Sequence, residues 1–244
     1  MTDTVNADPA ELAKFSELAH RWWDLESEFR PLHEINPLRL DWIDGIAPIA
    51  GRKVLDIGCG GGILSEPLAR LGAAVVGADP GEGNIAVARQ HAAEARVAVD
   101  YRATTAEALA DAGERFDLVL AMEVVEHVAD MAGFVRRCAA MVKPGGLMLA
   151  ATLNRTLKSF ALAIVGAEYV LGWLPRGTHQ WDRFVTPNEL EAAMARGGLR
   201  VIAESGVIYH PLRDRWQLAD DLDVNYMLVA ERPADRRDET AAAP

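Results

Sequence analysis

The sequence predicts an α/β fold built on a mostly parallel sheet. Three observations support this prediction: short apolar runs alternate with amphipathic segments, a glycine cluster directly follows one such run, and an acidic residue ends the next. The first run is 54–57, the glycine cluster is 58–62, and the acidic residue is Asp79. Glycine at such a turn lets the backbone approach a nucleotide-like ligand closely. The turn is therefore the first candidate binding site.

Composition limits the classes of function. The chain has 244 residues, half of them apolar, which is enough to bury the core of one domain. A net charge of -11 argues against a nucleic-acid partner, because phosphate binding needs a surplus of Lys and Arg. Two distant cysteines, Cys59 and Cys138, and the lack of an apolar signal segment predict a cytoplasmic protein. No apolar run reaches the roughly 18–20 residues that a membrane span requires.

The chain is expected to form a single domain over residues 11–232. Polar tails at 1–10 and 233–244 have no apolar side chains to hold them to a core. Within the domain, 11–50 is expected to form an N-terminal helical cover and 155–183 an apolar insertion.

Helical spacing of apolar residues predicts an amphipathic helix over 11–23 in the cover. Pro31 and Pro37 predict that 29–40 is broken into short turns, followed by a helix over 41–49. Such a cover could close over a site.

The middle of the chain alternates strands and helices. The predicted strands are 54–57, 74–78, 97–101, 116–121 and the residues after the turn at 144–146, and the predicted helices are 64–71, 84–95 and 130–141. The polar stretch 104–107 is expected to be a loop. Strands joined by helices run parallel, so we expect five parallel strands.

The end of the chain leaves this alternation. After the insertion, Thr186 is expected to open a helix, with Glu189 as its capping-box partner. The last two predicted strands, 199–208 and 225–231, are joined by a short link containing Pro211. A short link predicts an antiparallel pair at the sheet edge.

The glycine turn itself indicates which ligand it would hold. A dinucleotide-binding turn reads G-x-G-x-x-G, and here the third position is Ile63. Clustered glycines without the third one favour a nucleoside that carries no phosphates. Asp79, at the end of the second strand, could accept the hydroxyls of a ribose.

Longer motifs resemble class I methyltransferases that use S-adenosyl-L-methionine. These motifs are D-I-G-C-G-G-G at 56–62, Asp79, F-D-L-V-L-A-M-E-V-V-E-H-V at 116–128 and K-P-G-G at 143–146. Further motifs resemble the ubiquinone-biosynthesis O-methyltransferase family: F-S-E-L-A-H-R-W-W-D, F-R-P-L-H-E-I-N-P-L-R-L, T-L-N-R-T-L-K-S, V-G-A-E-Y-V-L, P-R-G-T-H and D-V-N-Y-M-L. The resemblance implies a Rossmann-like sheet of seven strands, the last antiparallel. Pro80 after Asp79 is a small departure.

By matching position, the resemblance places Arg39, Gly58, Asp79 and Met122 around the cofactor. Arg39 would pair with the methionine carboxylate, Gly58 would let the backbone approach, and Met122 would lie against adenine. Residue type alone leaves two alternatives open: Met122 could fill the core, and Arg39 could form a surface ion pair.

Glu123, Glu126 and His127 follow the fourth predicted strand and would share one face if the chain turned helical there. The resemblance implies a phenolic acceptor, whose pKa of about 10 means that deprotonation needs help. His127, with Glu126 beside it, could be the catalytic base, or all three residues could bind magnesium (Mg2+) and lower the hydroxyl pKa. In a third interpretation Glu126 only caps a helix and His127 packs beneath the substrate.

The insertion contains an apolar, aromatic stretch at 160–174, bounded by Arg155, Lys158 and Arg176. This pattern suits a membrane interface and equally suits a helix packed over the site. The resemblance favours the membrane, because a polyprenyl-tailed substrate resides in lipid. We therefore expect a protein peripherally associated with the inner face of the membrane.

Taken together, the resemblance implies an O-methyltransferase for polyprenylated phenols and catechols, serving both O-methylation steps of ubiquinone biosynthesis. The alternatives are another small phenolic acceptor, a nicotinamide-dependent oxidoreductase, and a catalytically silent membrane-bound scaffold. The resemblance also raises membership of a ubiquinone-biosynthesis complex, which the sequence does not decide.

Overall fold

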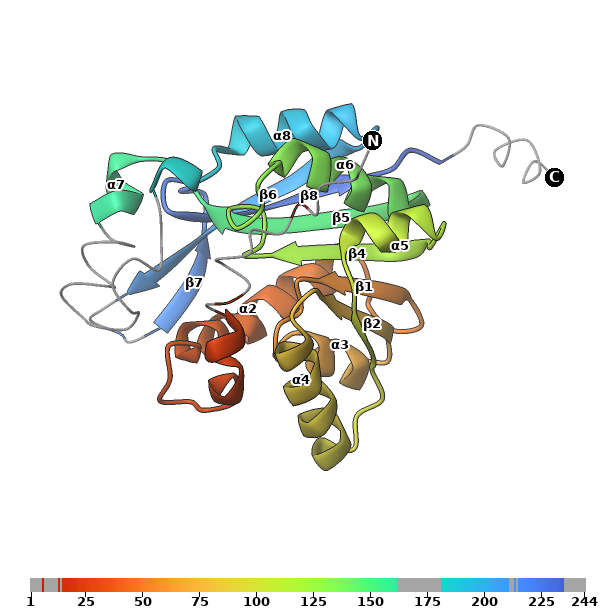
Figure 1. The fold of residues 1–244 in the computed structure, drawn as a ribbon. Helices are drawn as coiled ribbons and strands as arrows, with labels where there is room; N and C mark the ends of the chain where they lie inside the picture. The colour runs from red at the N-terminus through yellow and green to blue at the C-terminus, as the bar shows by residue number, and fades with distance from the viewer. Residues whose placement is uncertain are drawn as a thin grey trace.

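The computed structural model centres on one mixed sheet with helices on both faces (Figure 1). It describes residues 6, 13, 15–161, 181–210, 213 and 215–234. The strand order is β3-β2-β1-β4-β5-β8-β6-β7. The parallel strands are β1 (Lys53–Ile57), β2 (Ala74–Asp79), β3 (Asp100–Ala103), β4 (Phe116–Met122) and β5 (Val142–Leu153). The five predicted parallel strands are thus confirmed.

The antiparallel part of the sheet is larger than predicted. β8 (Asn225–Glu231) pairs with β5 and with β6 (Arg200–His210), which confirms the predicted antiparallel pair. A further strand, β7 (Arg215–Ala219), pairs with the end of β6, so the described sheet has eight strands rather than seven. β7 lies in the stretch that the sequence analysis took as a loop. Its five half-exposed residues carry little periodic signal, and pairing with β6 supplies the hydrogen bonds that fix it.

Two helical layers cover the sheet (Figure 1). The helices α5 (Ala106–Asp111), α6 (Met131–Met141) and α8 (Pro187–Arg196) lie on one face, and α2 (Arg30–Ile46), α3 (Ser65–Arg70) and α4 (Glu82–Ala95) lie on the other. The short helices η1 (Ala19–Arg21), α7 (Leu157–Ser159) and η3 (Trp181–Arg183) lie outside these layers. None of the described helices is long and apolar enough to cross a bilayer.

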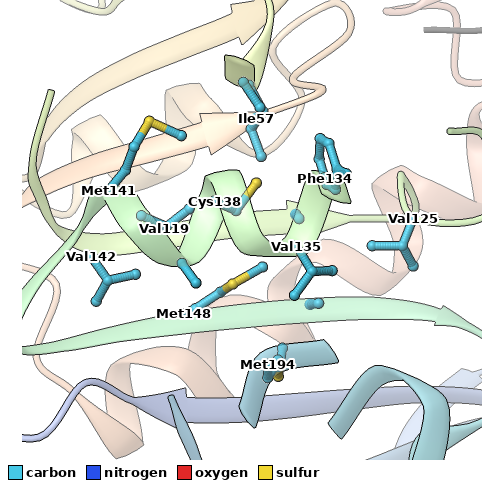
Figure 2. Close-up of a cluster of buried hydrophobic side chains, with 14 of the residues drawn as sticks. Ile57, Val119, Val125, Phe134, Val135, Cys138, Met141, Val142, Met148 and Met194 are labelled. Atoms are coloured by element: carbon cyan, nitrogen blue, oxygen red, sulfur yellow. The ribbon is translucent and has the colours of Figure 1, made fainter. Parts of the chain in front are cut away.

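The core on the first face is centred on α6 (Figure 2). Phe134, Val135 and Cys138 of α6 pack onto Met148 of β5, and Met194 of α8 closes the layer. Asp130 caps α6: its carboxylate accepts a hydrogen bond at 2.9 Å from the Gly133 backbone N–H, which has no partner within the helix. The helix therefore begins directly after Asp130.

The capping box predicted for α8 is present. The Thr186 hydroxyl accepts from the Glu189 backbone N–H, and the Glu189 carboxylate accepts from the Thr186 N–H. The predicted start of this helix is therefore confirmed.

The prediction of short turns over 29–40 is wrong, because α2 is continuous and contains Pro37. Pro31 sits in the first turn, where its missing N–H costs nothing. An interior proline costs about 3 kcal/mol. Burial of Ile35 and Ile43 against the sheet outweighs that cost, which the local sequence does not reveal.

The loop predicted at 104–107 covers only residues 104 and 105, because α5 begins at Ala106. Thr105 caps α5 by accepting a hydrogen bond from the Ala108 N–H, and Ala106 and Leu109 are buried against the core. The polar residues there mark the start of a helix rather than a loop.

The N-terminal segment packs against the body more closely than predicted. Within the helix expected over 11–23, residues 13 and 15–17 are helical, and the 3₁₀ turn η1 follows at Ala19. Trp22 then stacks on Phe29 with ring centroids 3.8 Å apart. Asn6, in the predicted loose tail, exchanges two hydrogen bonds with the backbone of Asp130. The prediction that nothing holds this tail is wrong at that residue.

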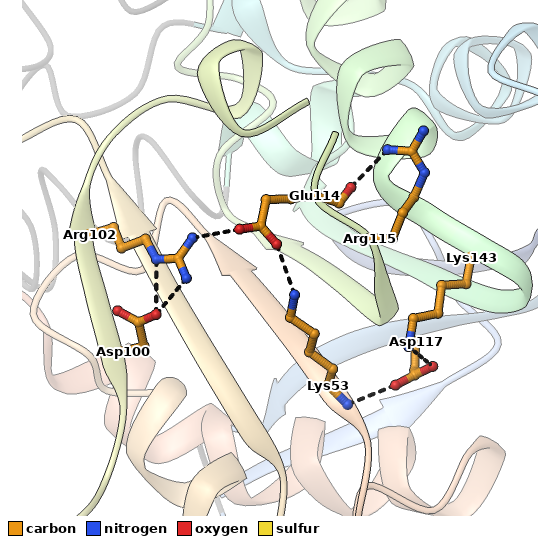
Figure 3. Close-up of polar contacts among 7 residues, drawn as sticks. All are labelled: Lys53, Asp100, Arg102, Glu114, Arg115, Asp117 and Lys143. Carbon is orange, nitrogen blue, oxygen red and sulfur yellow. Dashed lines mark hydrogen bonds and ion pairs between the residues drawn. The ribbon is translucent and has the colours of Figure 1, made fainter. Parts of the chain in front are cut away.

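The amino ends of the parallel strands carry a network of ion pairs and hydrogen bonds (Figure 3). It includes Lys53, Asp100, Arg102, Glu114, Arg115, Asp117 and Lys143. Glu114 is its centre and accepts from Lys53 Nζ at 2.8 Å and from Arg102 Nη1 at 3.0 Å. These side chains are partly solvent-exposed, so each pair contributes little stability.

A buried carboxyl group lies on β1 beside the glycine turn. Asp56 accepts a hydrogen bond from the Ser65 hydroxyl at 2.6 Å. Burial raises the pKa of Asp56 to about 7, because desolvation penalises its charged form. An acid whose pKa is higher in the folded state stabilises the fold at low pH, and that contribution is lost as pH rises through the folded-state pKa.

Replacing Asp56 by Asn should remove this pH dependence while keeping an acceptor for Ser65. Relative to the wild type, the free energy of unfolding of Asp56→Asn is expected to rise by roughly 2 kcal/mol between about pH 5 and about pH 8. Urea denaturation at both pH values measures the difference. The exposed Asp220→Asn is the control and should show no such trend. A difference between Asp56→Asn and the wild type that does not change with pH would contradict this account.

Candidate active site

The candidate site lies at the edge of the sheet where the parallel strands end. The carboxyl ends of β1, β2 and β4 meet there, and β8 begins at the same edge because it runs antiparallel. The register places Asn225 opposite Leu153, beyond the point where Met122 pairs with Ala151. Open α/β sheets bind ligands at this edge.

The glycine turn is close-packed from several sides. Gly60 has a φ of +51°, which favours glycine, and a Cβ there would lie 2.5 Å from the Trp22 ring. A Cβ on Gly61 would lie 2.4 Å from Trp22, and one on Gly58 would lie 2.5 Å from Val124. Close approach of aromatic and aliphatic side chains therefore explains part of the glycine cluster that the sequence analysis assigned to a ligand.

Asp79 ends β2 with its carboxylate held by three N–H donors. The Gly60 N–H donates to Oδ2 at 3.1 Å, and the Gly81 N–H and Asn84 Nδ2 donate to Oδ1 at 2.8 and 3.1 Å. Burial raises the pKa of Asp79, and these hydrogen bonds oppose that rise by favouring the charged form. Oδ2 has one donor and can accept a further hydroxyl.

Arg39 reaches the same edge from α2. Its guanidinium is buried and forms an ion pair with Glu123, which directly follows β4. Glu123 also accepts from Asn225 Nδ2 at 3.0 Å. Nε of Arg39 is buried without a hydrogen-bond partner. Arg39 thus forms an ion pair, the alternative that residue type left open, but the guanidinium lies in the interior rather than at the surface.

The stretch after β4 is not helical. Glu123 has a φ of +58°, a conformation that non-glycine residues rarely adopt, and α6 begins only at Met131. The expectation that Glu123, Glu126 and His127 share a helical face is therefore wrong. Strained backbone of this kind is common at functional sites.

Glu126 and His127 occupy different environments within this stretch. Glu126 is buried, and burial raises its pKa above the ordinary value, opposed by nearby His127 and reinforced by Glu123. His127 is half-buried and meets the edge of the Phe15 ring, with ring centroids 5.2 Å apart. The N-terminal cover thus reaches the proposed base.

The three residues proposed as magnesium ligands do not form a metal-binding group. Among the described residues, no three His, Cys, Asp or Glu side chains are placed to hold an ion. Glu123 is instead bound by Arg39 and Asn225. The residues as arranged here do not fit a magnesium site.

The four proposed cofactor residues lie along this edge in two linked pairs. Gly58 and Asp79 are joined through the glycine turn, and Arg39 contacts Glu123, the neighbour of Met122. Val124, in contact with Gly58, connects the pairs. Met122 is half-buried and packs against the cluster of Ile35, Ala151, Val207 and Met227.

Sequence reasoning missed two asparagines at this edge. Asn225 binds Glu123, and Asn84 binds Asp79. A signal was present for each: Asn225 begins an antiparallel strand, which places it at the carboxyl edge of the parallel strands, and Asn84 follows Asp79 by five residues in the next helix.

Several buried polar atoms beside β4 have no hydrogen-bond partner. Nε of Arg39 and Oδ1 of Asn225 have none, and Oε2 of Glu126 and Oγ1 of Thr152 have only each other at a distance too long for a good hydrogen bond. Buried polar groups are nearly always paired in folded proteins, so such a concentration indicates a place where a polar ligand completes the hydrogen bonds.

Residues 31–204 match the family model described as a methyltransferase domain. The ubiquinone biosynthesis O-methyltransferase of Methylobacterium sp. (strain 4-46) is 60% identical, over 93% of this chain and 96% of its own length. The protein of the same name from Azorhizobium caulinodans is 56% identical, over 95% of this chain and 96% of its own length.

A solved structure shows the same fold at low sequence identity. It is magnesium protoporphyrin IX methyltransferase from Synechocystis PCC 6803 with bound SAH, which is 19% identical, with a TM-score of 0.64 over 90% of this chain and 94% of its own. The full-length identity to the curated relatives is far higher. The chain therefore belongs to the ubiquinone biosynthesis O-methyltransferase family of methyltransferase-domain proteins.

Proposed function

We propose that this protein transfers a methyl group from S-adenosyl-L-methionine to hydroxyl groups of polyprenylated phenols and catechols in ubiquinone biosynthesis, in both O-methylation steps. The observation that carries the proposal is the group of unpartnered buried polar atoms beside the end of β4. Arg39 Nε is available to the cofactor, and Asn225 Oδ1, Glu126 Oε2 and Thr152 Oγ1 are available to an acceptor hydroxyl near the end of β4. The family's name supplies the class of acceptor.

The proposed cofactor site uses the charges of this edge. Oδ2 of Asp79 has room for one ribose hydroxyl beside the Gly60 N–H. The unpartnered Nε of Arg39 is a donor for the methionine carboxylate, and an ionic hydrogen bond of this kind is about twice as strong as a neutral one. Met122 provides a soft apolar surface for adenine.

In methyl transfer the cofactor supplies an electrophilic methyl group on a sulfonium, whose leaving electron pair stays on sulfur. The acceptor oxygen forms the new bond to carbon and must lose its proton. We assign that proton to His127, whose imidazole lies below Phe15 of the cover. Glu126 is buried beside it and stabilises the imidazolium that forms.

A magnesium-assisted route was the second interpretation of the same three residues. Because Glu123 is engaged by Arg39 and Asn225, we derive no step through a metal ion. The fixed Glu123 serves instead to hold Arg39 and Asn225 in place at the boundary between the cofactor and acceptor sites.

We further propose contact with a membrane surface through the insertion. Most of the proposed contact segment, 160–174, lies outside the described residues. Its first residue, Phe160, is exposed, as are Leu157 before it and Trp181 after it. Arg155 and Lys158, which bound the segment, pair with Glu189 and Asp221. The proposal therefore rests on apolar contact rather than on charge.

Replacing His127 by Ala should remove most methyl transfer and leave cofactor binding intact, because the imidazole accepts a proton but does not hold the cofactor. We expect turnover to fall by about 10²-fold or more, as is usual for loss of a general base. Turnover is measured with a short-tailed catechol, and binding of S-adenosylhomocysteine is measured by calorimetry. His20→Ala, at an exposed histidine, is the matched control. Unchanged turnover in His127→Ala would rule out this role.

Deleting residues 160–174 should weaken binding to liposomes while binding of S-adenosylhomocysteine persists. The variant Leu157→Ser keeps the chain length and should show a smaller loss in the same direction, because it removes one exposed apolar side chain. Co-sedimentation with phospholipid vesicles measures both variants. Equal sedimentation of wild type and deletion would argue that lipid is reached elsewhere.

A further inference from the structure

A hydrogen-bond chain leads from the N-terminal cover to the carboxylate of Asp79. Trp22 Nε1 donates to Asn84 Oδ1 at 2.9 Å, and Asn84 Nδ2 donates to Asp79 Oδ1 at 3.1 Å. All three residues are buried. Trp22 comes from the cover, Asn84 from α4 and Asp79 from the end of β2, so three separate elements meet in this chain.

The chemistry of the indole fixes the direction of this chain. An indole N–H can only donate, so the oxygen of the Asn84 amide must face Trp22. The NH₂ group of the same amide then faces Asp79. Without the indole N–H, the Asn84 oxygen loses its donor, and the amide is held only by its bond to Asp79, so it orients the carboxylate less firmly.

The Asn84 amide completes the set of donors that orients Asp79. Gly60 holds Oδ2, whereas Gly81 and Asn84 hold Oδ1. The two glycine donors are backbone groups, so Asn84 is the one side chain among these three donors. Its N–H keeps Oδ1 occupied and leaves Oδ2 as the oxygen with room for a hydroxyl.

The ring of Trp22 is anchored independently of its N–H. It stacks on Phe29 and packs onto Gly60 and Gly61 with no space for a Cβ at either position. A phenyl ring at position 22 could keep much of this contact. The hydrogen bond and the packing of Trp22 can therefore be separated by mutation.

We propose that Asn84 and Trp22 are positioning residues for the cofactor ribose: Trp22 sets the Asn84 amide, and Asn84 sets the Asp79 carboxylate that accepts a ribose hydroxyl. The inference rests on the proposed use of S-adenosyl-L-methionine. It gives the N-terminal cover a role in cofactor recognition in addition to shielding the site. Trp22, in the cover, helps to orient Asp79, the residue that binds the ribose.

The test compares two ligands in calorimetry with the full-length protein: S-adenosylhomocysteine and its analogue lacking both ribose hydroxyls. Trp22→Phe should weaken binding of S-adenosylhomocysteine by about tenfold, the usual effect of one hydrogen bond. Its effect on the dideoxy analogue should be less than about twofold, because that ligand has no hydroxyl for Asp79. Asn84→Ala should show the same pattern, and the double variant should be no weaker than Asn84→Ala alone.

Two further tryptophans provide controls. Trp23→Phe loses an indole hydrogen bond to the Gly61 carbonyl, in the same cover but without a link to Asp79. Trp216→Phe loses an indole hydrogen bond to Glu34, which has no hydrogen bond to Asp79 or Asn84. Trp23→Phe should weaken both ligands by the same factor or by none, and Trp216→Phe should change neither affinity.

The outcomes separate the inference from the proposed function. If the wild type binds neither ligand, the proposed cofactor itself is wrong. If the wild type binds S-adenosylhomocysteine but Trp22→Phe weakens both ligands equally, the tryptophan only supports the fold of the cover and the inference is overturned. An unchanged affinity in Trp22→Phe or Asn84→Ala would overturn it as well.

Discussion

Charged groups buried at the carboxyl edge of the sheet are the constraint on which the rest of this structure depends. A carboxylate or guanidinium removed from water is costly unless other groups donate to it or pair with it. Asp79 is held by two backbone N–H groups and Asn84, and Arg39 pairs with Glu123, which also accepts from Asn225. These groups come from α2, α4, β8, the segment after β4 and the turn after β1, so distant parts of the chain must converge for the edge to form.

The same requirement explains how much the sequence could predict. Apolar runs and turns can be recognised from local sequence patterns. These patterns correctly predicted the five parallel strands, the glycine turn and the capping box of α8. Continuous α2 and the edge strand β7 depend on tertiary burial and pairing, which override the proline and the weak pattern. Neither tertiary burial nor strand pairing can be predicted from the local propensities of the residues.

The sequence identified most residues of the candidate site but not the contacts among them. Motif positions supplied Arg39, Asp79 and the residues after β4, yet only the fold revealed that Glu123 is engaged by Arg39 and Asn225 rather than grouped with Glu126 and His127. The left-handed backbone at Glu123 breaks the helical spacing on which that grouping depended. The contacts of Glu123 with Arg39 of α2 and Asn225 of β8 join three distant segments, so no single stretch of sequence predicts them.

We propose that residues at this edge transfer a methyl group to an acceptor oxygen without a metal held by Glu123, Glu126 and His127. The most direct measurement is transfer of labelled methyl from S-adenosyl-L-methionine to a short-tailed prenyl catechol, using enzyme treated with a chelator. We expect label on a catechol oxygen in the treated enzyme. Bound cofactor with no labelled product, or product that returns only when magnesium is added, would contradict it.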